Sequence, residues 1–286
     1  MKIALALLLF LGAAEARAQV QVELRLPRLQ FIAYEPVVAT IGITNLAGRD
    51  IELHDADGET WFGFEVTGSQ GQSIGPIKPV AQPPLKIGAG QHVTQKINLT
   101  PLFQVQDYGA YHVRAHIYFP DLSKYFYSQA KVFEVTDARP VWQQTVGMPE
   151  GAGPGNARTY SLMTNRFPDH TSLYVRIANK DTGVVYATYS LGRMIIYDDP
   201  KVQIDKTNQL HVLHCSAPRT WSYSVIGLNG ELVSHTTYME TKTRPRLLQT
   251  ADGMVAVRGG MVEAPAATTA SKATVPKLSD RPQNDE

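Results

Sequence analysis

Hydrophobic and polar residues alternate with a period of two in short runs from Gln19 to Thr136, and Gly, Pro, Asn and Asp separate the runs. Such alternation is typical of half-buried β-strands, because successive side chains of a strand point to opposite faces of the sheet. Residues 159–262 are also rich in strand-forming runs, although these are organised differently. The sequence therefore predicts an all-β protein with two strand-rich halves.

Seven or eight strands are expected in residues 19–137, with turns about every 8 to 12 residues, a spacing typical of a Greek-key sandwich. Pro27 should divide the first strand, because proline has no N–H to donate to the ladder. The expected strands are residues 20–26 with 29–33, 37–45, 61–66, 73–78, 83–87, 92–99, 111–119 and 125–135.

Three short motifs stand out in this half: Tyr34-Glu35-Pro36-Val37-Val38 closed by Asn45, Ile87-Gly88-Ala89-Gly90, and Asp107-Tyr108-Gly109-Ala110-Tyr111. Together they resemble bacterial secreted Ig-like modules of the macroglobulin-domain or fibronectin-like kind. The resemblance implies an N-terminal Ig-like Greek-key sandwich over residues 19–137. In that fold the Tyr111 hydroxyl would bond back to the preceding corner, and Val113 would take the position of the antibody-domain cysteine. No thioester motif or bait region accompanies the motifs, so a macroglobulin trapping mechanism is not implied.

Residues 159–262 contain an internal repeat of two strands joined by a turn. A gap-free alignment of Pro200 with Pro245 matches apolar positions and sets Asn208 over Gly253. Repeats of about 40 to 45 residues with four strands each resemble propeller blades. About two and a half such units are too few for a closed ring, which needs at least about four. We therefore expect a C-terminal antiparallel β-meander with blade-like repeats, or a small sandwich, packed on the first half, unless several chains associate into a ring.

Two hairpins are expected within this meander. Residues 221–228 and 231–238 flank Asn229-Gly230, which predicts a type I′ turn with two positive-φ residues. A weaker copy pairs residues 172–177 with 184–191 around Lys180-Asp181-Thr182-Gly183.

The ends and the middle of the chain are expected to lie outside the folded halves. Residues 1–18 have the charged start, short apolar run and A-x-A site of a secretory signal peptide, with cleavage before Gln19. That run is shorter than the roughly 20 residues of a membrane-spanning helix, and no later segment qualifies, so no integral membrane segment is expected. Residues 138–158 are expected to be a linker, because Gly and Pro accumulate there, and residues 263–286 a disordered tail. The signal peptide therefore predicts a secreted or periplasmic protein.

The charge balance of the chain narrows the classes of partner. The full chain has 27 basic and 26 acidic residues, and removal of Lys2, Glu15 and Arg17 with the signal peptide leaves 25 of each. A neutral chain has no global field that would attract nucleic acid, so no nucleic-acid partner is expected.

Cys215 is the only cysteine, which excludes an intrachain disulfide. We expect it to be buried as a small apolar residue, and a reactive free thiol is the alternative.

Two loop patterns could carry chemistry. Gly71-Gln72-Ser73-Ile74-Gly75 matches a nucleophile elbow, but that device needs a helix after the serine, and Pro76 and Pro79 favour a Gly-rich hairpin. The segment His54-Asp55-Ala56-Asp57-Gly58-Glu59 gathers oxygens that could hold calcium, and it is equally typical of a solvated turn. The hairpin and the turn are the interpretations that we favour.

A zinc site is a further possibility at His211, His214 and Cys215. On a strand, His211 and Cys215 point to one face and His214 to the other, so the three could bind zinc only with ligands from elsewhere. We therefore expect no catalytic residue, no metal site and no cofactor.

The candidate binding residues are two aromatic pairs, Trp221 with Tyr223 and Tyr186 with Tyr189. Trp221 and Tyr223 share one face of a strand, and exposed flat rings could stack on sugar rings or anchor a protein partner. Alternatively, the rings fill the core of a sheet, where aromatic residues are common. The sequence leaves both interpretations open.

Our first hypothesis is an exported non-enzymatic binding or structural protein, whose partner is an unidentified protein or a cell-envelope glycan. The second is a glycan-binding enzyme or an enzyme accessory protein. An enzyme should gather carboxylates in a cleft lined by Trp221, and the candidates are Asp198, Asp199, Asp205 and Glu231. A third hypothesis, an Ig-like protease-inhibitor module acting through residues 70–79, rests on fold analogy alone.

Overall fold

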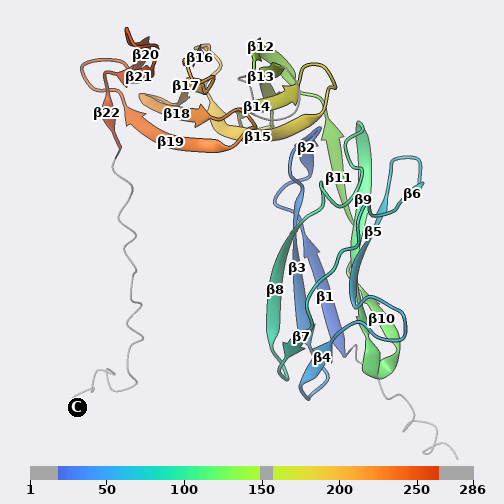
Figure 1. Cartoon of the computed structure of the whole chain (residues 1–286). Coiled ribbons are helices and arrows are strands. Elements are labelled where there is room, and N and C mark those ends of the chain that lie inside the picture. The colour runs from blue at the N-terminus through green and yellow to red at the C-terminus, as the bar shows by residue number, and fades with distance from the viewer. Residues whose placement is uncertain (1–18, 149–156, 264–286) are drawn as a thin grey trace, which may run out of the picture.

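The computed structural model describes residues 19–148 and 157–263. Within these ranges the chain forms β-strands and one short 3₁₀ helix, Pro120–Leu122, and contains no α-helix, so the expected all-β class is confirmed. No helix in the described part could span a lipid bilayer. Figure 1 shows two strand-rich halves, the second of which lies across one end of the first. The expected signal peptide (residues 1–18) and almost all of the expected tail (residues 264–286) lie outside the described residues.

The first half is built from two larger sheets. One has the antiparallel order β1-β3-β8, and the other has the order β2-β11-β9-β5-β6 with β10 beside β9. The strands are β1 Val20–Arg25, β2 Gln30–Ile32, β3 Val38–Asn45, β5 Phe62–Thr67, β6 Ser73–Ile74, β8 His92–Asn98, β9 Gly109–Phe119, β10 Lys124–Tyr127 and β11 Lys131–Thr136. A small third sheet pairs β4 (Ile51–Leu53) with β7 (Leu85–Ile87). This arrangement is compatible with a β-sandwich.

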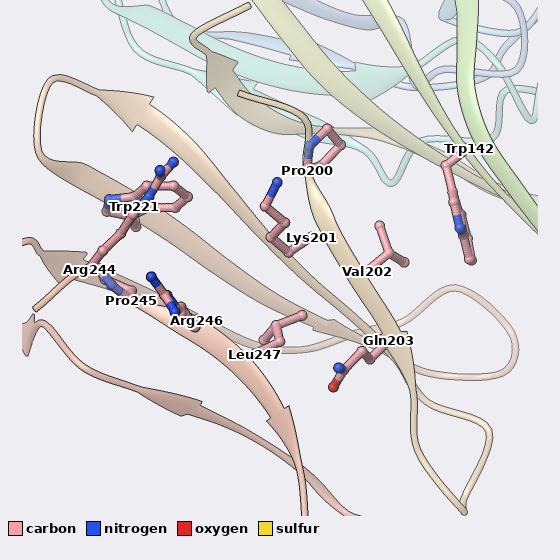
Figure 2. Close-up of a pocket in the computed structure, with 10 residues that line it drawn as sticks. All are labelled: Trp142, Pro200, Lys201, Val202, Gln203, Trp221, Arg244, Pro245, Arg246 and Leu247. Carbon is pink, nitrogen blue, oxygen red and sulfur yellow. The ribbon is translucent and has the colours of Figure 1, made fainter. Parts of the chain in front are cut away.

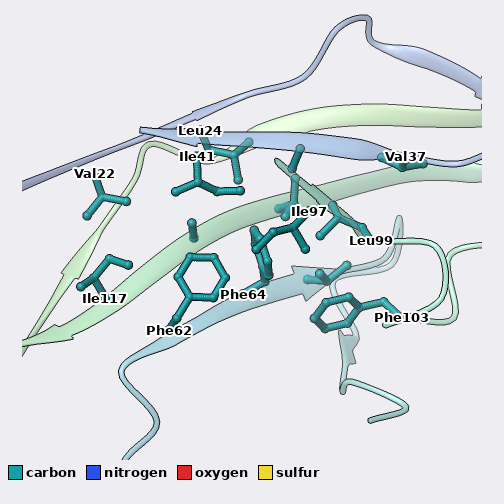
Figure 3. Close-up of a cluster of buried hydrophobic side chains, with 14 of the residues drawn as sticks. Val22, Leu24, Val37, Ile41, Phe62, Phe64, Ile97, Leu99, Phe103 and Ile117 are labelled. Atoms are coloured by element: carbon teal, nitrogen blue, oxygen red, sulfur yellow. The ribbon is translucent and has the colours of Figure 1, made fainter. Parts of the chain in front are cut away.

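A single hydrophobic core lies between the two larger sheets, as Figure 3 shows for residues of both. Alternate residues of β3, including Ile41 and Ile43, are fully buried, and so are Trp61 and Val113. Each such side chain contributes about 1.5 to 3 kcal/mol through burial, so this packing is the main source of stability in the absence of a disulfide. The indole nitrogen of Trp61 donates a 3.1 Å hydrogen bond to the carbonyl oxygen of Gln82, which satisfies its one polar atom inside the core.

Several details of the first half differ from the expected strands. Strand β4 was not expected, and the strand expected over residues 73–78 is only the two residues of β6. The strand over residues 125–135 is divided into β10 and β11, because the amide of Ala115 bonds to the Ser128 side chain and interrupts the ladder with β9. The first strand is divided at Pro27 as expected, but its two parts join different sheets. β1 pairs antiparallel with β3, and β2 pairs parallel with β11.

The second half is an antiparallel meander, as expected, and it contains three units. The units are the sheet β12-β13-β14-β15, the sheet β16-β17-β18-β19-β22 and the hairpin β20-β21. The strands are β12 Arg139–Gly147, β13 Ala157–Arg166, β14 Thr171–Asn179, β15 Val185–Met194, β16 Lys201–Ile204, β17 Leu210–Ala217, β18 Thr220–Ile226, β19 Leu232–Met239, β20 Arg246–Gln249, β21 Val255–Arg258 and β22 Met261–Val262.

The expected linker over residues 138–158 overlaps these strands. Arg139–Gly147 forms β12 and pairs with β13, because the alternating side chains of Trp142 and Val146 pack into the core beneath the first sheet. The Gly- and Pro-rich composition that suggested a linker belongs to the residues after β12, and residues 149–156 lie outside the described ranges. The boundaries of the two domains stay a prediction.

Strand β17 lies in the middle of the second half and is buried on both faces. Leu210 and Val212 face the first sheet of this half, whereas Leu213 and Cys215 face the β20-β21 hairpin. Cys215 is thus a buried small residue, as the sequence predicted, and burial raises the pKa of its thiol. The β17 sheet is therefore the middle layer between two others.

The structure confirms the internal repeat, and its two turns are also alike. Asn208 and Gly253, which the alignment matches, have φ values of 62° and 79°. In the first turn the amide of Asp205 bonds to the carbonyl of Gln209, and Thr250 bonds in the same way to Met254 in the second. The two hairpins therefore have the same local conformation.

The prediction of a type I′ turn at Asn229-Gly230 is wrong. Only Gly230 has a positive φ, and its amide bonds to the carbonyl of Gly227. The amide of Gly227 bonds to the carbonyl of Glu231, so the loop has three residues, 228–230, with Gly230 in the left-handed position. The weaker hairpin, formed by β14 and β15, is confirmed.

Polar contacts join the two halves. Arg28 donates a 2.7 Å hydrogen bond to the Tyr174 hydroxyl and forms an ion pair with the buried Glu35. Arg176 donates a 2.6 Å hydrogen bond to the carbonyl oxygen of Ala33. Beside these contacts, Ile32 and Ala138 pack against Met163 and Tyr174 of the first meander sheet.

Candidate binding site

A pocket of about 630 Å³ opens among the three units of the second half. Three of the strands that line it are the first strands of successive units, namely β12, β16 and β20. Figure 2 shows Trp142 on one side of the pocket, Arg244 and Arg246 on the other, and Lys201 between them. The remaining lining residues are Pro200, Val202, Gln203, Trp221, Pro245 and Leu247.

The repeat explains why these residues meet. A short hairpin connects β16 to β17 and another connects β20 to β21, so β16 and β20 occupy equivalent positions in their units. The alignment of Pro200 with Pro245 therefore puts Lys201 and Arg246 at matching positions. Both side chains are exposed, whereas Leu247, the next residue of β20, is buried beneath the hairpin.

Trp221 belongs to the buried wall of the pocket. Its ring is only 2% exposed, and its indole nitrogen donates a 3.2 Å hydrogen bond to Glu240. The guanidinium carbon of Arg244 lies 4.3 Å from the ring centroid, which is the geometry of a cation–π contact. The indole is thus covered, and the outer surface at this point is the arginine.

The electrostatics of the pocket are dominated by cations. Asp198 forms ion pairs with Arg244 and with Lys201, whose Nζ lies 3.2 Å from Asp198 Oδ1. Arg246 forms no ion pair with any described residue. Of the described residues, three cations and no acidic residue line the pocket, so its lining is positively charged, with Asp198 and Glu240 beside it.

Tyr223 is half-buried on the same face of β18 as Trp221, as predicted. Its hydroxyl lies 2.7 Å from Nδ1 of His211, and Nε2 of that histidine lies 3.0 Å from the buried carboxylate of Asp205. Burial, followed by the neighbouring Tyr238 and Asp205, raises the pKa of Tyr223 to about 12. A raised pKa opposes use of the phenolate as a nucleophile, so this row of three groups fits a structural role.

Asp205 also fixes the turn that precedes β17. Its Oδ1 accepts hydrogen bonds from the amides of Thr207 and Gln209 and from the Thr207 hydroxyl. These bonds and that from His211 hold its pKa below the ordinary value despite its burial, which acts in the opposite direction. Asp205 is therefore an ionised anchor between a turn and two strands.

Tyr186 and Tyr189 lie apart from Trp221 and Tyr223, against the core beneath the first sheet of this half. Both are half-buried, and they line a smaller hollow of about 370 Å³ that also includes Tyr34 of the first half. The guanidinium carbon of Arg158 lies 4.3 Å from the Tyr186 ring centroid. Burial raises the pKa of Tyr189 to about 12. The two predicted aromatic pairs thus occupy different places.

The three possible zinc ligands do not converge. His211 bonds to Asp205 and Tyr223 on one face of β17, and Nε2 of His214 lies 3.1 Å from the carbonyl oxygen of Arg193 on the other. Burial lowers the pKa of His214 to about 4. In the described part of the chain, no group of three metal-ligating side chains is close enough to hold an ion.

The oxygens of residues 54–59 point to separate partners. Asp55 accepts the amide of Trp61, Asp57 accepts the Tyr118 hydroxyl, and Glu59 accepts the Tyr125 hydroxyl. Ser73 begins strand β6, which pairs antiparallel with β5, so its motif lies in a hairpin. Both segments are therefore parts of turns and hairpins, as favoured from the sequence.

The four carboxylates considered for an enzyme lie in different surroundings. Asp198 pairs with Arg244 beside the pocket, whereas Asp205 is buried next to His211. Glu231 accepts a hydrogen bond from the amide of Asn229 in the β18-β19 turn. Asp199 is exposed, and of the four only Asp198 pairs with residues that line the pocket.

Sequence reasoning missed Trp142, Arg244 and Arg246. Trp142 was assigned to the linker, and the arginines lie in the third unit, which offered no motif. The repeat alignment did contain a signal, because it matches Lys201 with Arg246 and so places two cations at equivalent positions.

Comparisons with known proteins add no family. No protein-family model matches the sequence, and a search of curated proteins gives no significant match.

Proposed function

We propose that this chain is an exported, non-enzymatic binding protein that attaches to a protein or glycan of the cell envelope through its second half. The observation that carries the proposal is the pocket where β12, β16 and β20 meet, with Lys201 between Trp142 and Arg246. It presents an aromatic ring and unpaired positive charge, the kinds of group that recognise sugars and anionic groups.

The buried polar groups support a non-enzymatic role. His211, Asp205 and Tyr223 use their polar atoms on one another and on a turn. A catalytic acid or base needs access to a substrate proton, and these groups are enclosed. Activity on a bound glycan is the alternative, and a test for it is simple: release of reducing ends from a glycan that the chain retains.

The first half would serve as an Ig-like scaffold. The strand orders β1-β3-β8 and β2-β11-β9-β5-β6 support this assignment. The 2.8 Å hydrogen bond from the Tyr111 hydroxyl to the carbonyl oxygen of Asp107 supports it further, because a tyrosine corner is a hallmark of that fold. Rigid β-sandwiches commonly hold binding surfaces at a distance from their point of attachment.

The second half would be a partial, blade-like array. Successive meanders whose first strands face a common hollow are typical of propeller blades around their central channel. The three units here would form an open arc, whose inner side is accessible to a larger partner than a closed ring would admit.

Retention of the chain without residues 1–18 on native envelope material tests the proposal. We expect the wild-type chain to recover one stoichiometric protein partner or to be retained on purified cell-wall glycan. Lys201→Glu with Arg246→Glu should abolish retention, and Lys96→Glu on the exposed surface of β8 is the matched control. Equal retention of the pocket variant and the wild type would exclude this pocket, and no retention at all would exclude the function.

A further inference from the structure

A second hollow, of about 730 Å³, lies beside the pocket on the β20-β21 hairpin. We propose that this groove, together with the pocket, docks an acidic polysaccharide, that is, a glycan chain with carboxylate groups at intervals. The inference rests on the proposed binding function and names the chemistry of its ligand. The groove is lined by Lys242, Thr243, Arg244, Arg246, Leu248, Arg258 and Gly259.

Strand alternation creates the charged surface. In β20 and β21, Leu247 and Val255 face inward and are buried, so Arg246, Leu248 and Arg258 face outward. These three outward side chains are all exposed. The outward face is thus available to a ligand.

The charges on this face are not balanced by the protein. Arg246 and Arg258 occupy directly paired positions of the antiparallel ladder. Like charges at such positions destabilise a sheet, because the Cβ atoms are only about 4.5 to 5.5 Å apart. No acidic residue lines the groove, and Arg244 is the one lining cation with an ion pair in the described part of the chain. A bound anion would relieve this repulsion.

The residue types favour an anionic group that accepts two parallel hydrogen bonds, such as a carboxylate. A guanidinium group is planar and binds carboxylates or phosphates in a bidentate manner, which a lysine ammonium cannot do. Three of the four cations in the groove are arginines. Leu248 is the only large apolar residue of its lining, so there is little to recognise the side chains of a peptide.

The neighbouring pocket favours a sugar polymer over an acidic protein segment. Arg244 and Arg246 line both hollows, so the positive surface continues from Lys242 to Lys201 around β20. Trp142 is half-buried at the far side of the pocket. Aromatic rings stack on pyranose faces, and a ring beside a row of cations suits a chain of sugar acids.

Binding of the full chain to polygalacturonate tests the inference. Binding to neutral dextran and to poly-glutamate is measured for comparison. We expect binding to polygalacturonate alone, a fall in affinity with added salt, and at least about tenfold weaker binding for Arg246→Gln with Arg258→Gln. Arg166→Gln, at an exposed arginine outside the groove, is the matched control. The melting temperature of the double variant should be equal to or above that of the wild type, because the variant removes repulsion.

Three outcomes would overturn the inference: equal binding by the double variant, equal binding of dextran, or equal binding of poly-glutamate, which would point to an acidic protein instead. If polygalacturonate does not bind but native envelope material retains the chain through Lys201 and Arg246, the ligand class is wrong and the proposed function stands. If neither binds, both fail.

Discussion

The hydroxyl of Tyr111 donates a 2.8 Å hydrogen bond to the carbonyl oxygen of Asp107, four residues earlier in the chain. The ring itself stacks on Phe133, with centroids 5.3 Å apart. One side chain therefore closes a turn through its polar end and joins β9 to β11 through its apolar body. A phenylalanine could supply only the second contact.

Replacing Tyr111 by phenylalanine should lower the free energy of unfolding by about 0.5 to 1.5 kcal/mol, the net value of one hydrogen bond. Denaturant unfolding of the full chain measures the change. Tyr197→Phe, at a side chain that is 99% exposed, is the control and should have no effect. If the two variants are equally stable, the hydrogen bond contributes nothing.

Each of the two repeated turns contains an aspartate that accepts hydrogen bonds within the turn, although the repeat aligns Asp205 with Thr250 and Asp252 with Thr207. Asp205→Ala should cost about 2 to 4 kcal/mol, because it leaves the buried His211 and the turn amides without their acceptor. Asp252 accepts similar bonds in an exposed turn, and Asp252→Ala should cost much less. Thermal unfolding of the two variants compares them, and equal losses would contradict a special role for the buried network.

His214 should make the fold sensitive to acid. Burial lowers its pKa to about 4, so below pH about 6.5 the unfolded chain binds a proton that the folded chain does not. Stability should therefore fall as pH decreases from about 6.5 to 4, by an amount on the order of 3 kcal/mol. His214→Gln should reduce this pH dependence, measured by denaturant unfolding at several pH values. His92→Gln, at an exposed histidine of β8, should leave it unchanged.

The junction between the halves should depend on Arg176. Besides its bond to Ala33, its guanidinium carbon lies 5.2 Å from the Tyr34 ring centroid. Arg176→Ala should speed amide hydrogen exchange in residues 30–36 and leave the core of β3 protected, because only the contact across the junction is lost. Arg166→Ala, at an exposed arginine of β13, serves as the control. Unchanged exchange in residues 30–36 would show that the Arg28–Tyr174 hydrogen bond and apolar packing hold the junction without Arg176.

The sequence by itself determined the class of fold and most strands. Alternation, turn residues and the repeat are local signals, and the period of two leaves few other ways to bury the apolar face. It also determined that Trp221 and Tyr223 share a face and that His214 opposes His211, because side-chain direction follows from strand geometry alone.

Only the tertiary structure decided which faces are covered. Strand β17 is buried on both sides, so its histidines and Cys215 are enclosed, and Trp221 lies beneath Arg244 rather than at the surface. The pocket combines residues from β12, β16 and β20, which are far apart in the sequence. The physical reason is that local periodicity fixes the direction of a side chain relative to its own strand, whereas burial and charge pairing depend on which other layer packs against that strand.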